Sequence, residues 1–415
     1  MAGTVRSVRA LQNSDHVVVV GAGLAGWRFV EALRREGFDG PLTLIGDETD
    51  APYDRPPLSK NVLVGKWGLE RATLATDELI EKANVTLRLG ERATGLDVAN
   101  TTVQLDDGSS VSGSRVVIAT GTRARRLAFS ADEALHVIRR MADVRRLNED
   151  LATLEPGATI VVIGGGFIGA EAATALNTRG FHVVVLEAAP RPLINVLGEQ
   201  VSAWLLSLAE QVGVDLRVDQ KIRDVEKTDD GLRVVFEDGT ILDADAVIQG
   251  VGVETNVEWL ATSGLRIDNG VVVDEHFMAA DAVAAIGDVA RFAWSSVTGR
   301  DSVRIEHWEV ANGHASTLAK LWTTGEEPAE MMVPYFWSDQ YAKKIQLLGH
   351  PRASDEILRV SGSDAALKWI GLYSRDGIVT GVVTLNNPRG LMLSRPLLET
   401  PTTLEDAVAK APWAI

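Results

Sequence analysis

Cysteine is absent from this 415-residue chain. Without thiols the chain can form no disulfide, no thiolate metal site and no cysteine-held iron–sulfur cluster, and it contains no dithiol redox centre. We predict no metal site. The composition fits an intracellular protein, which we expect in the cytoplasm.

Excess positive charge and long apolar runs are also missing. The chain has 41 Lys and Arg against 57 Asp and Glu, a formal net charge of −16, which argues against a general nucleic-acid or anionic-membrane binder. No run of about 20 uncharged apolar residues is present to cross a membrane. Residues 6–26 are basic and then apolar like a signal peptide, but the apolar run ends in a glycine motif, so we expect residues 1 to about 15 to form a flexible tail.

The remaining composition, with 46% hydrophobic and 24% charged residues, is typical of a soluble globular protein. The chain is long enough to bury large cores. At about 150 residues per domain, we expect two or three domains.

A dinucleotide-binding unit is predicted over residues 158–191. An apolar run at 160–163 predicts a buried parallel strand, and Gly164, Gly166 and Gly169 follow in G-x-G-x-x-G spacing before a helical pattern. The first glycine permits a tight turn, the second lets backbone approach a pyrophosphate, and the third allows close helix–strand packing. A second strand, 183–186, ends at Glu187, whose carboxylate can accept hydrogen bonds from a ribose. This complete order favours a nucleotide site over a structural glycine-rich turn.

The residues after Glu187 favour NADH over NADPH. Ala188, Ala189 and Pro190 follow it, so no cation stands where a 2′-phosphate would have to be neutralised. Arg191 is the nearest cation, and it either meets the pyrophosphate or is a solvated loop residue.

The first part of the chain repeats this pattern. A strand at 17–20 leads into Gly21, Gly23 and Gly26 with the same spacing, and the next strand, 42–45, ends near Asp47, which is either a ribose ligand or a turn acid. Each half continues with a small meander and a buried strand ending in glycine. This duplication predicts two similar nucleotide-binding domains.

The pattern changes after about residue 254. A strand runs into Gly287 and Asp288, where the acid can bond a polyol hydroxyl or cap a helix, and a helix begins near Trp308. From about residue 331 onward we expect a hairpin about the turn Ser374 to Gly377 and a short helix at 403–410. The aromatic cluster in this last section is either core or cofactor wall: Tyr335, Phe336, Trp337 and Tyr341.

The motifs resemble, in their order, those of the FAD- and NADH-dependent ferredoxin reductases of oxygenase systems, the putidaredoxin reductase and biphenyl dioxygenase reductase type of the glutathione-reductase superfamily. The resemblance covers the chain from about Asp15. It rests on "VVVVGAGLAG", "LIGDE", "PYDRPPLSK", "VVIATG", "VVIGGGFIGAE", "AIGDVARF", "RIEHWEVA" and "FWSDQY". Ala279, where relatives usually carry Thr, and the bulky Trp27 depart from the pattern.

The resemblance implies an α/β fold with two Rossmann-like three-layer domains and a smaller α+β C-terminal domain. Residues 1–121 and 252–329 would bind FAD, residues 122–251 would bind NADH, and residues 330–415 would form an interface domain. The implied FAD contacts are Gly21, Gly23, Ala25, Gly26, Asp47, Arg55, Lys60, Ala93, Ala119, Gly121, Arg139, Gly287, Asp288 and Trp308. The implied NADH contacts are Gly164, Gly166, Phe167, Ile168, Gly169, Glu171, Glu187, Arg191 and Gly252.

Within these sets the resemblance implies a catalytic pair, Lys60 and Glu171. Lys60 would lie by the isoalloxazine and stabilise negative charge on the reduced flavin, while Glu171 holds its ammonium in place. The alternative is a salt bridge that serves stability alone. Phe167 would shield the flavin until nicotinamide enters.

The implied activity is hydride transfer from NADH to FAD and one-electron transfer to a ferredoxin, an iron–sulfur protein that feeds a haem-thiolate monooxygenase or a Rieske dioxygenase. With no dithiol, electrons must leave directly from the flavin. We expect no nucleic-acid or membrane partner. Alternatives are a rubredoxin or monodehydroascorbate-like reductase, or an NADH-binding flavoprotein similar to apoptosis-inducing factor. Candidates for a basic face toward an acidic ferredoxin are Arg55, Arg71, Arg304, Lys343, Lys344 and Arg389.

Overall fold

The computed structural model describes residues 9–296, 299–326 and 333–414. The chain divides into two compact units. Unit 1 comprises Met1–Asp54, Thr73–Arg123 and Thr255–Pro334, and unit 2 comprises Arg55–Ala72, Ala124–Glu254 and Tyr335–Ile415. The predicted NADH-binding and C-terminal segments thus fall in the same unit, and the assignment of a nucleotide to each segment stays a prediction.

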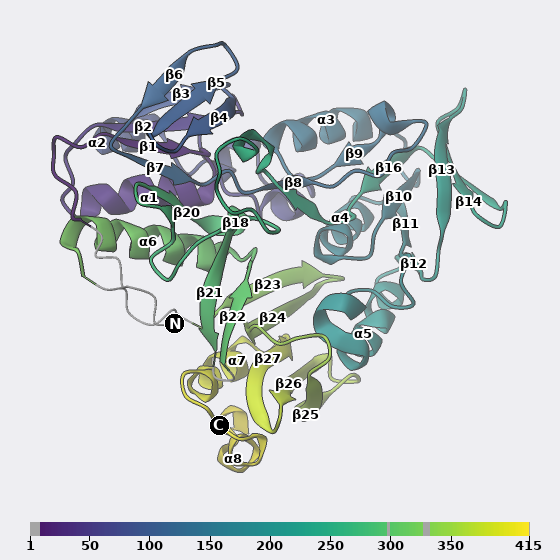
Figure 1. Cartoon of the computed structure of the whole chain (residues 1–415). Helices are drawn as coiled ribbons and strands as arrows, with labels where there is room; N and C mark the ends of the chain where they lie inside the picture. Colours follow the sequence, from purple (N-terminus) through teal and green to yellow (C-terminus); the bar gives the residue numbers. More distant parts are fainter. Residues whose placement is uncertain (1–8, 297–298, 327–332, 415) are drawn as a thin grey trace. The chain divides into compact units, whose positions relative to one another are not determined.

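Unit 1 is built on a six-stranded sheet with strand order β19-β20-β7-β1-β2-β3 (Figure 1). Neighbouring strands from β20 to β3 pair in parallel. β1 reads Val-Val-Val-Val and is buried along its whole length, as expected for a parallel strand covered on both faces. The strands are β1 (Val17–Val20), β2 (Leu42–Gly46), β3 (Thr86–Leu89), β7 (Arg115–Ile118), β19 (Met278–Ala280) and β20 (Val283–Ala285).

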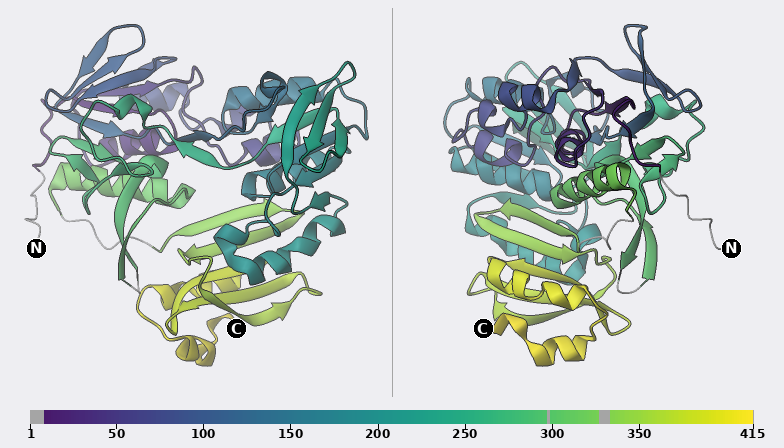
Figure 2. Two further views of the ribbon diagram at one scale, coloured as in Figure 1. Left: turned by 45° about the vertical axis from the view of Figure 1, so that its right-hand side comes forward. Right: turned by 90° about the vertical axis from the view of Figure 1, so that its left-hand side faces the viewer.

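Two helices, α1 (Leu24–Arg35) and α6 (Trp308–Thr324), lie side by side on one face of this sheet (Figures 1 and 2). A three-stranded antiparallel sheet packs on the same core, and it contains β4 (Ala93–Asp97), β5 (Thr102–Leu105) and β6 (Ser110–Ser112). The bulky Trp27 of α1 and Trp322 of α6 are both fully buried in this core. Trp27 therefore fills space between layers.

The rest of unit 1 consists of short elements. They are α2 (Asp77–Ala83), η4 (Glu258–Leu260), β18 (Val271–Val272), η5 (Gly287–Val289), β21 (Ala290–Ser296) and β22 (Gly299–Val303). β8 (Thr122–Ala124) and β17 (Val253–Thr255) form a two-stranded sheet at the points of the chain where unit 1 ends and resumes.

Unit 2 contains a second parallel sheet with strand order β12-β11-β10-β16-β9. A small antiparallel sheet packs its apolar side against this sheet in one hydrophobic core. The main strands are β9 (His136–Val137), β10 (Thr159–Ile163), β11 (His182–Leu186), β12 (Asp215–Arg217) and β16 (Ala246–Gln249). The small sheet contains β13 (Ile222–Lys227), β14 (Leu232–Phe236) and β15 (Ile241–Ala244). The helical elements are η1 (Leu58–Val62), η2 (Leu69–Ala72), η3 (Asp132–Ala134), α3 (Met141–Leu151), α4 (Phe167–Thr178) and α5 (Ile194–Gln211).

The C-terminal part of unit 2 is an antiparallel sheet with strand order β23-β24-β27-β26-β25, in green to yellow at the end of the chain (Figure 2). Asp376 and Gly377 join β26 to β27, and their φ values of 50° and 76° are those of a two-residue hairpin turn. The strands are β23 (Tyr335–Gln340), β24 (Lys343–Gly349), β25 (Glu356–Ser363), β26 (Lys368–Arg375) and β27 (Ile378–Leu385). The helical elements are α7 (Pro388–Leu393), η6 (Arg395–Leu398), α8 (Leu404–Lys410) and η7 (Pro412–Ala414).

The predicted flexible tail is wrong over residues 9–15, while residues 1–8 lie outside the described residues. The Leu11 N–H donates to the Trp322 carbonyl at 2.6 Å, and Leu11 packs on the unit 1 core. Asp15 is buried and accepts both the Arg9 guanidinium and the Gln12 N–H. This segment is polar in composition but is held by the end of α6, which sequence periodicity does not reveal.

None of the helices in the described part of the chain has the length and apolar character needed to span a membrane.

Candidate functional site

In unit 1 the first glycine motif forms a tight turn between β1 and α1. Gly21 has φ +117°, and a Cβ there would lie 2.2 Å from the Ala119 carbonyl oxygen. A Cβ at Gly26 would lie 2.0 Å from the Gly21 carbonyl oxygen. These two glycines are therefore required by packing: one brings β1 against the end of β7, and the other brings α1 against the turn.

Gly23 differs from its neighbours because a Cβ there would meet no described atom within 4 Å. It is the N-cap of α1, and within the described chain no side chain caps this helix and no acidic residue occupies its first turn. Backbone N–H groups at such a helix start favour an anion, and glycine at this position lets the anion approach. The turn thus fits the pyrophosphate of a dinucleotide such as FAD.

Other predicted FAD residues lie at the same edge of the sheet, where the parallel strands end. Asp47 follows β2 and is exposed, and Gly121, with φ +61°, follows β7. Gly287 follows β20 close to α1, because a Cβ on it would lie 2.7 Å from the Cβ of Ala25. Asp288 is the next residue. The edge therefore gathers the predicted pyrophosphate, ribose and ribityl contacts, as expected for the carboxyl ends of parallel strands.

Ala93 and Trp308 border this edge. The Glu91 N–H donates to the Gly46 carbonyl at 3.0 Å, which places the start of β4, where Ala93 lies, beside the end of β2. The Trp308 indole N–H donates to an Asp54 carboxylate oxygen at 2.7 Å. Asp54 is not among the predicted site residues, although it lies inside the "PYDRPPLSK" motif.

A buried histidine supports the loop at Gly287. His314 of α6 is 1% exposed, and its Nδ1 accepts the Gly287 N–H at 3.2 Å. The rings of Phe277 and Phe292 lie against the imidazole, with centroid separations of 4.5 and 4.6 Å. Burial lowers the pKa of His314 from 6.5 to about 3. The imidazole is therefore neutral in the folded protein.

This histidine should make the protein less stable in acid. Below pH 6.5 the His314 imidazole binds a proton in the unfolded chain, whereas in the folded protein it stays neutral down to about pH 3. The free energy of unfolding therefore falls as the pH drops through this window. At about 1.4 kcal/mol per pH unit, the loss reaches about 2 kcal/mol at pH 5. In His314→Gln the amide oxygen can accept the same N–H, but the side chain does not titrate. Between pH 7 and pH 5 we expect the free energy of unfolding of this variant to fall by about 2 kcal/mol less than that of the wild type, as measured by urea titration. If the free energy of unfolding depended on pH in the same way in the wild type and in His314→Gln, this prediction would be contradicted.

In unit 2 the second glycine motif has the same construction. Gly164 has φ +104° and packs against Gly250 at the end of β16, and a Cβ at Gly169 would lie 2.0 Å from the Gly164 carbonyl oxygen. Gly166 is again the N-cap of a helix, α4, for which the described chain supplies no side-chain cap. A Cβ at Gly166 would make only an ordinary contact, 3.9 Å from the Gly250 oxygen.

Glu187 follows β11, and its carboxylate is hydrogen-bonded to the backbone of the glycine turn. One carboxylate oxygen accepts the Gly165 N–H and the other accepts the Ala189 N–H, each at 2.8 Å. Each oxygen keeps a further lone pair for a ribose hydroxyl, and the negative charge disfavours a 2′-phosphate. Arg191 forms an ion pair with Glu199 at 2.7 Å, so the structure places it against α5. Its predicted contact with the pyrophosphate stays a prediction.

The remaining predicted NADH residues line the start of α4 and the end of β16. Ile168 is 42% exposed in the first turn of α4, and the Phe167 ring lies 4.4 Å from the Phe336 ring between centroids. Gly252, with φ +100°, follows β16, and its carbonyl accepts the Arg125 N–H at 2.9 Å. An exposed apolar side chain and an aromatic ring at this helix start suit a planar nicotinamide.

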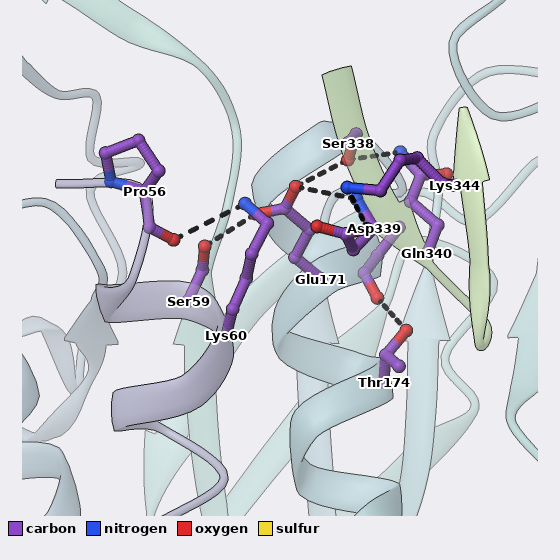
Figure 3. Close-up of polar contacts among 10 residues, drawn as sticks. Pro56, Ser59, Lys60, Glu171, Thr174, Ser338, Asp339, Gln340 and Lys344 are labelled. Carbon is purple, nitrogen blue, oxygen red and sulfur yellow. Dashed lines mark hydrogen bonds and ion pairs between the residues drawn. The ribbon is translucent and has the colours of Figure 1, made fainter. Parts of the chain in front are cut away.

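Lys60 and Glu171 meet in unit 2, as the resemblance implies (Figure 3). The Lys60 Nζ donates to a Glu171 carboxylate oxygen at 2.7 Å, and the two side chains are 18% and 3% exposed. Lys60 lies in η1 with non-helical φ −120° and ψ −107°, and its Nζ is also 3.4 Å from the Pro56 carbonyl oxygen. The pair is therefore shielded from water. In such a buried place the interaction between two charges is stronger than at the surface.

Three predicted FAD residues belong to unit 2: Arg55, Lys60 and Arg139. The Arg55 guanidinium donates to the Arg139 carbonyl oxygen, so these two predicted residues are adjacent. Of the candidates for a basic face, Arg304 pairs with Glu306 and Lys344 pairs with Asp339, while the Arg71 guanidinium lies over the Trp67 ring. The basic face stays a prediction.

Comparisons with known proteins give consistent matches. The family described as "Pyridine nucleotide-disulphide oxidoreductase" matches residues 15–315, and "Reductase C-terminal" matches residues 335–413. Rhodocoxin reductase of Rhodococcus erythropolis is 33% identical over 397 residues, which cover 94% of this chain and 91% of that protein. The ferredoxin–NAD(+) reductase component of the anthranilate 1,2-dioxygenase system of Burkholderia cepacia is 35% identical over 391 residues, covering 93% and 94%.

A solved structure is similar over nearly the whole chain. The crystal structure of the covalent putidaredoxin reductase–putidaredoxin complex matches with a TM-score of 0.90 and 32% identity, covering 97% of this chain and 100% of that chain. The predicted resemblance, the α/β fold class and the use of FAD and NADH are confirmed by these matches. The roles predicted for individual site residues stay predictions.

Proposed function

We propose that this chain, which belongs to the pyridine nucleotide-disulphide oxidoreductase family, carries electrons from NADH through FAD to a ferredoxin of an oxygenase system. The relatives named above include a reductase component of a dioxygenase system and a reductase solved in complex with its redox partner. We likewise propose that residues 1–121 and 252–329 bind FAD, that residues 122–251 bind NADH, that residues 330–415 form an interface domain, and that the protein is cytoplasmic.

The observation that carries this proposal combines two glycine turns, each opening a helix that no described side chain caps, with the shielded Lys60–Glu171 ion pair in a chain that has no cysteine. FAD, when bound, supplies the chemistry of accepting a hydride and releasing electrons one at a time. A dithiol cannot relay electrons here. The acceptor must therefore take them from the flavin site itself.

The residues of the chain bind and orient the two nucleotides. Gly23 and the N–H groups that start α1 hold the FAD pyrophosphate, and Gly166 and α4 do the same for NADH. Glu187 selects a ribose without a 2′-phosphate. Lys60, held by Glu171, places a positive charge where negative charge develops as the flavin is reduced.

Salt should weaken the productive encounter with ferredoxin. Because both this chain and a typical ferredoxin are acidic, their association requires a local basic face, and screening of that face raises KM. We expect kcat/KM for a [2Fe–2S] ferredoxin to fall roughly tenfold between 20 and 300 mM NaCl. The limiting rate of flavin reduction at saturating NADH, which involves no ferredoxin, is the control and should stay within about twofold.

Acceptor screening tests the function itself. Steady-state assays with NADH would compare [2Fe–2S] ferredoxins, rubredoxin and the monodehydroascorbate radical. Ferredoxin should give the highest kcat/KM. A preference for rubredoxin or for the radical would overturn the proposed acceptor, and a long-lived reduced complex that ferredoxin fails to reoxidise would favour a role in partner binding.

A further inference from the structure

The first strand of the C-terminal sheet runs along one face of α4. The Phe336 ring contacts Phe167, the Ser338 hydroxyl contacts Glu171, and the backbone N–H of Tyr341 donates to the Thr174 hydroxyl at 2.7 Å. The three α4 residues are spaced by four and three positions, so they share one side of the helix. The segment "FWSDQY" therefore follows the stripe of α4 that carries the predicted catalytic carboxylate.

Among the described residues, four donors form hydrogen bonds to Glu171, two on each carboxylate oxygen (Figure 3). Oε2 accepts the Ser59 hydroxyl at 2.6 Å and the Lys60 ammonium at 2.7 Å. Oε1 accepts the Ser338 hydroxyl at 2.6 Å and the Asp339 N–H at 3.3 Å. The Asp339 contact is long, so Ser338 provides the main anchor of the oxygen that Lys60 does not touch.

The direction of the Ser338 hydroxyl is fixed by its other neighbour. The Gln340 side-chain amide donates to the Ser338 oxygen at 3.1 Å, which leaves the hydroxyl proton to point at Glu171. Ser338 is 0% exposed and Gln340 is 2% exposed, so water does not compete for these bonds. A chain of aligned donors in a dry environment strengthens each of its hydrogen bonds.

We propose that Ser338 is a positioning residue for hydride transfer from NADH to the flavin. It acts through Glu171: by fixing Oε1 it sets the plane of the carboxylate, and the plane sets where Oε2 holds the Lys60 ammonium. The C-terminal sheet thereby takes part in flavin reduction as well as in the predicted interface. This role rests on the proposed function, because it presupposes that NADH reduces the flavin.

The test is stopped-flow reduction of the FAD-bound variants by NADH. Ser338→Ala should lower the limiting rate about tenfold while the Kd for NADH stays within about twofold, because the lost bond is to a charged group. Ser338→Thr keeps the hydroxyl and should stay within about threefold of the wild type. The flavin midpoint potential should fall in Ser338→Ala and be unchanged in Ser338→Thr, a change that a merely structural role would not produce.

Ser202→Ala is the matched control. Ser202 lies on α5 in the same unit and is 0% exposed, and its hydroxyl has no hydrogen-bond partner among the described residues. Its removal should leave the rate and the potential unchanged. FAD content and thermal midpoint are measured for every variant.

The outcomes separate this role from the proposed function. Wild-type reduction rates in Ser338→Ala, or a fall that only matches lost FAD, would overturn the positioning role. A wild-type flavin that NADH does not reduce would overturn both. A flavin that NADH reduces but that no ferredoxin reoxidises would overturn the proposed acceptor and leave the role of Ser338 standing.

Discussion

Replacing Lys60 by alanine is expected to slow flavin reduction by NADH about 100-fold, with the Kd for NADH changed by less than about threefold. The ammonium lies 2.7 Å from Glu171, and its side chain is only 18% exposed. A charge held in this shielded place stabilises the electron-rich product more than it stabilises the bound substrates. Its loss should therefore raise the barrier and leave NADH binding nearly unchanged. Stopped-flow absorbance of the oxidised flavin measures both quantities.

A second effect of the same substitution distinguishes chemistry from stability. Without Lys60 the buried Glu171 carboxylate loses its counter-charge, which costs about 3–5 kcal/mol for a fully buried pair and less for one that retains some exposure. Adding Glu171→Gln to Lys60→Ala removes that charge and should recover much of the stability without recovering the rate. If the double variant recovered both the stability and the rate of flavin reduction, the Lys60–Glu171 pair would serve stability alone.

Lys66→Ala is the control for this experiment. Lys66 is exposed and lies in the same segment of unit 2, so its substitution removes an equal charge without touching Glu171. It should leave reduction kinetics unchanged. Unchanged kinetics in Lys60→Ala itself would contradict the assignment of Lys60 to the flavin.

The two glycine units were predictable because their signals are local. β1 and β10 are buried on both faces, so they appear as uninterrupted apolar runs, and each ends in a glycine that the turn requires at positive φ. The predicted strand limits, 17–20 and 160–163, agree with the observed strands to within one residue. The predicted helix at 403–410 likewise matches α8, whose N-cap is Thr403.

The remaining elements lack such an uninterrupted apolar run. β13 and β25 have mixed burial, so their side chains do not alternate cleanly between apolar and polar. α7 begins with Pro388 after an Asn387 cap, a helix-start signal that was present in the sequence. α5 begins at Ile194 and continues through a kink at Gly198, which interrupts its helical pattern.

The support of the site was the least predictable part. The resemblance implied the Lys60–Glu171 pair, but the hydroxyls of Ser59 and Ser338 reach Glu171 across 112 and 167 positions of sequence. The Asp54–Trp308 bond spans 254 positions. Single polar residues so far apart produce no pattern in the sequence, and only the folded chain brings them together.

Gly23→Ala is expected to leave the fold of the protein intact and to weaken FAD binding about 100-fold or more. A Cβ at this position would meet no atom of the described residues within 4 Å, so the added methyl group should not disturb the turn. The methyl group would stand where backbone must approach the pyrophosphate, and there it would displace the cofactor from the N–H groups of α1. Titration of the apoprotein with FAD, followed by flavin fluorescence, measures the affinity, and thermal unfolding of the apoprotein measures the fold.

Gly26→Ala and Gly166→Ala make the comparison specific. The Gly26 Cβ would lie 2.0 Å from a backbone oxygen, so this variant should lower the thermal midpoint of the apoprotein itself. Gly166→Ala places its methyl group at the start of α4, and it should retain FAD while losing affinity for NADH by a similar factor. If Gly23→Ala bound FAD as the wild type does, α1 would not hold the pyrophosphate. If Gly166→Ala also lost FAD, the separation of the two nucleotides between the two glycine units would be wrong.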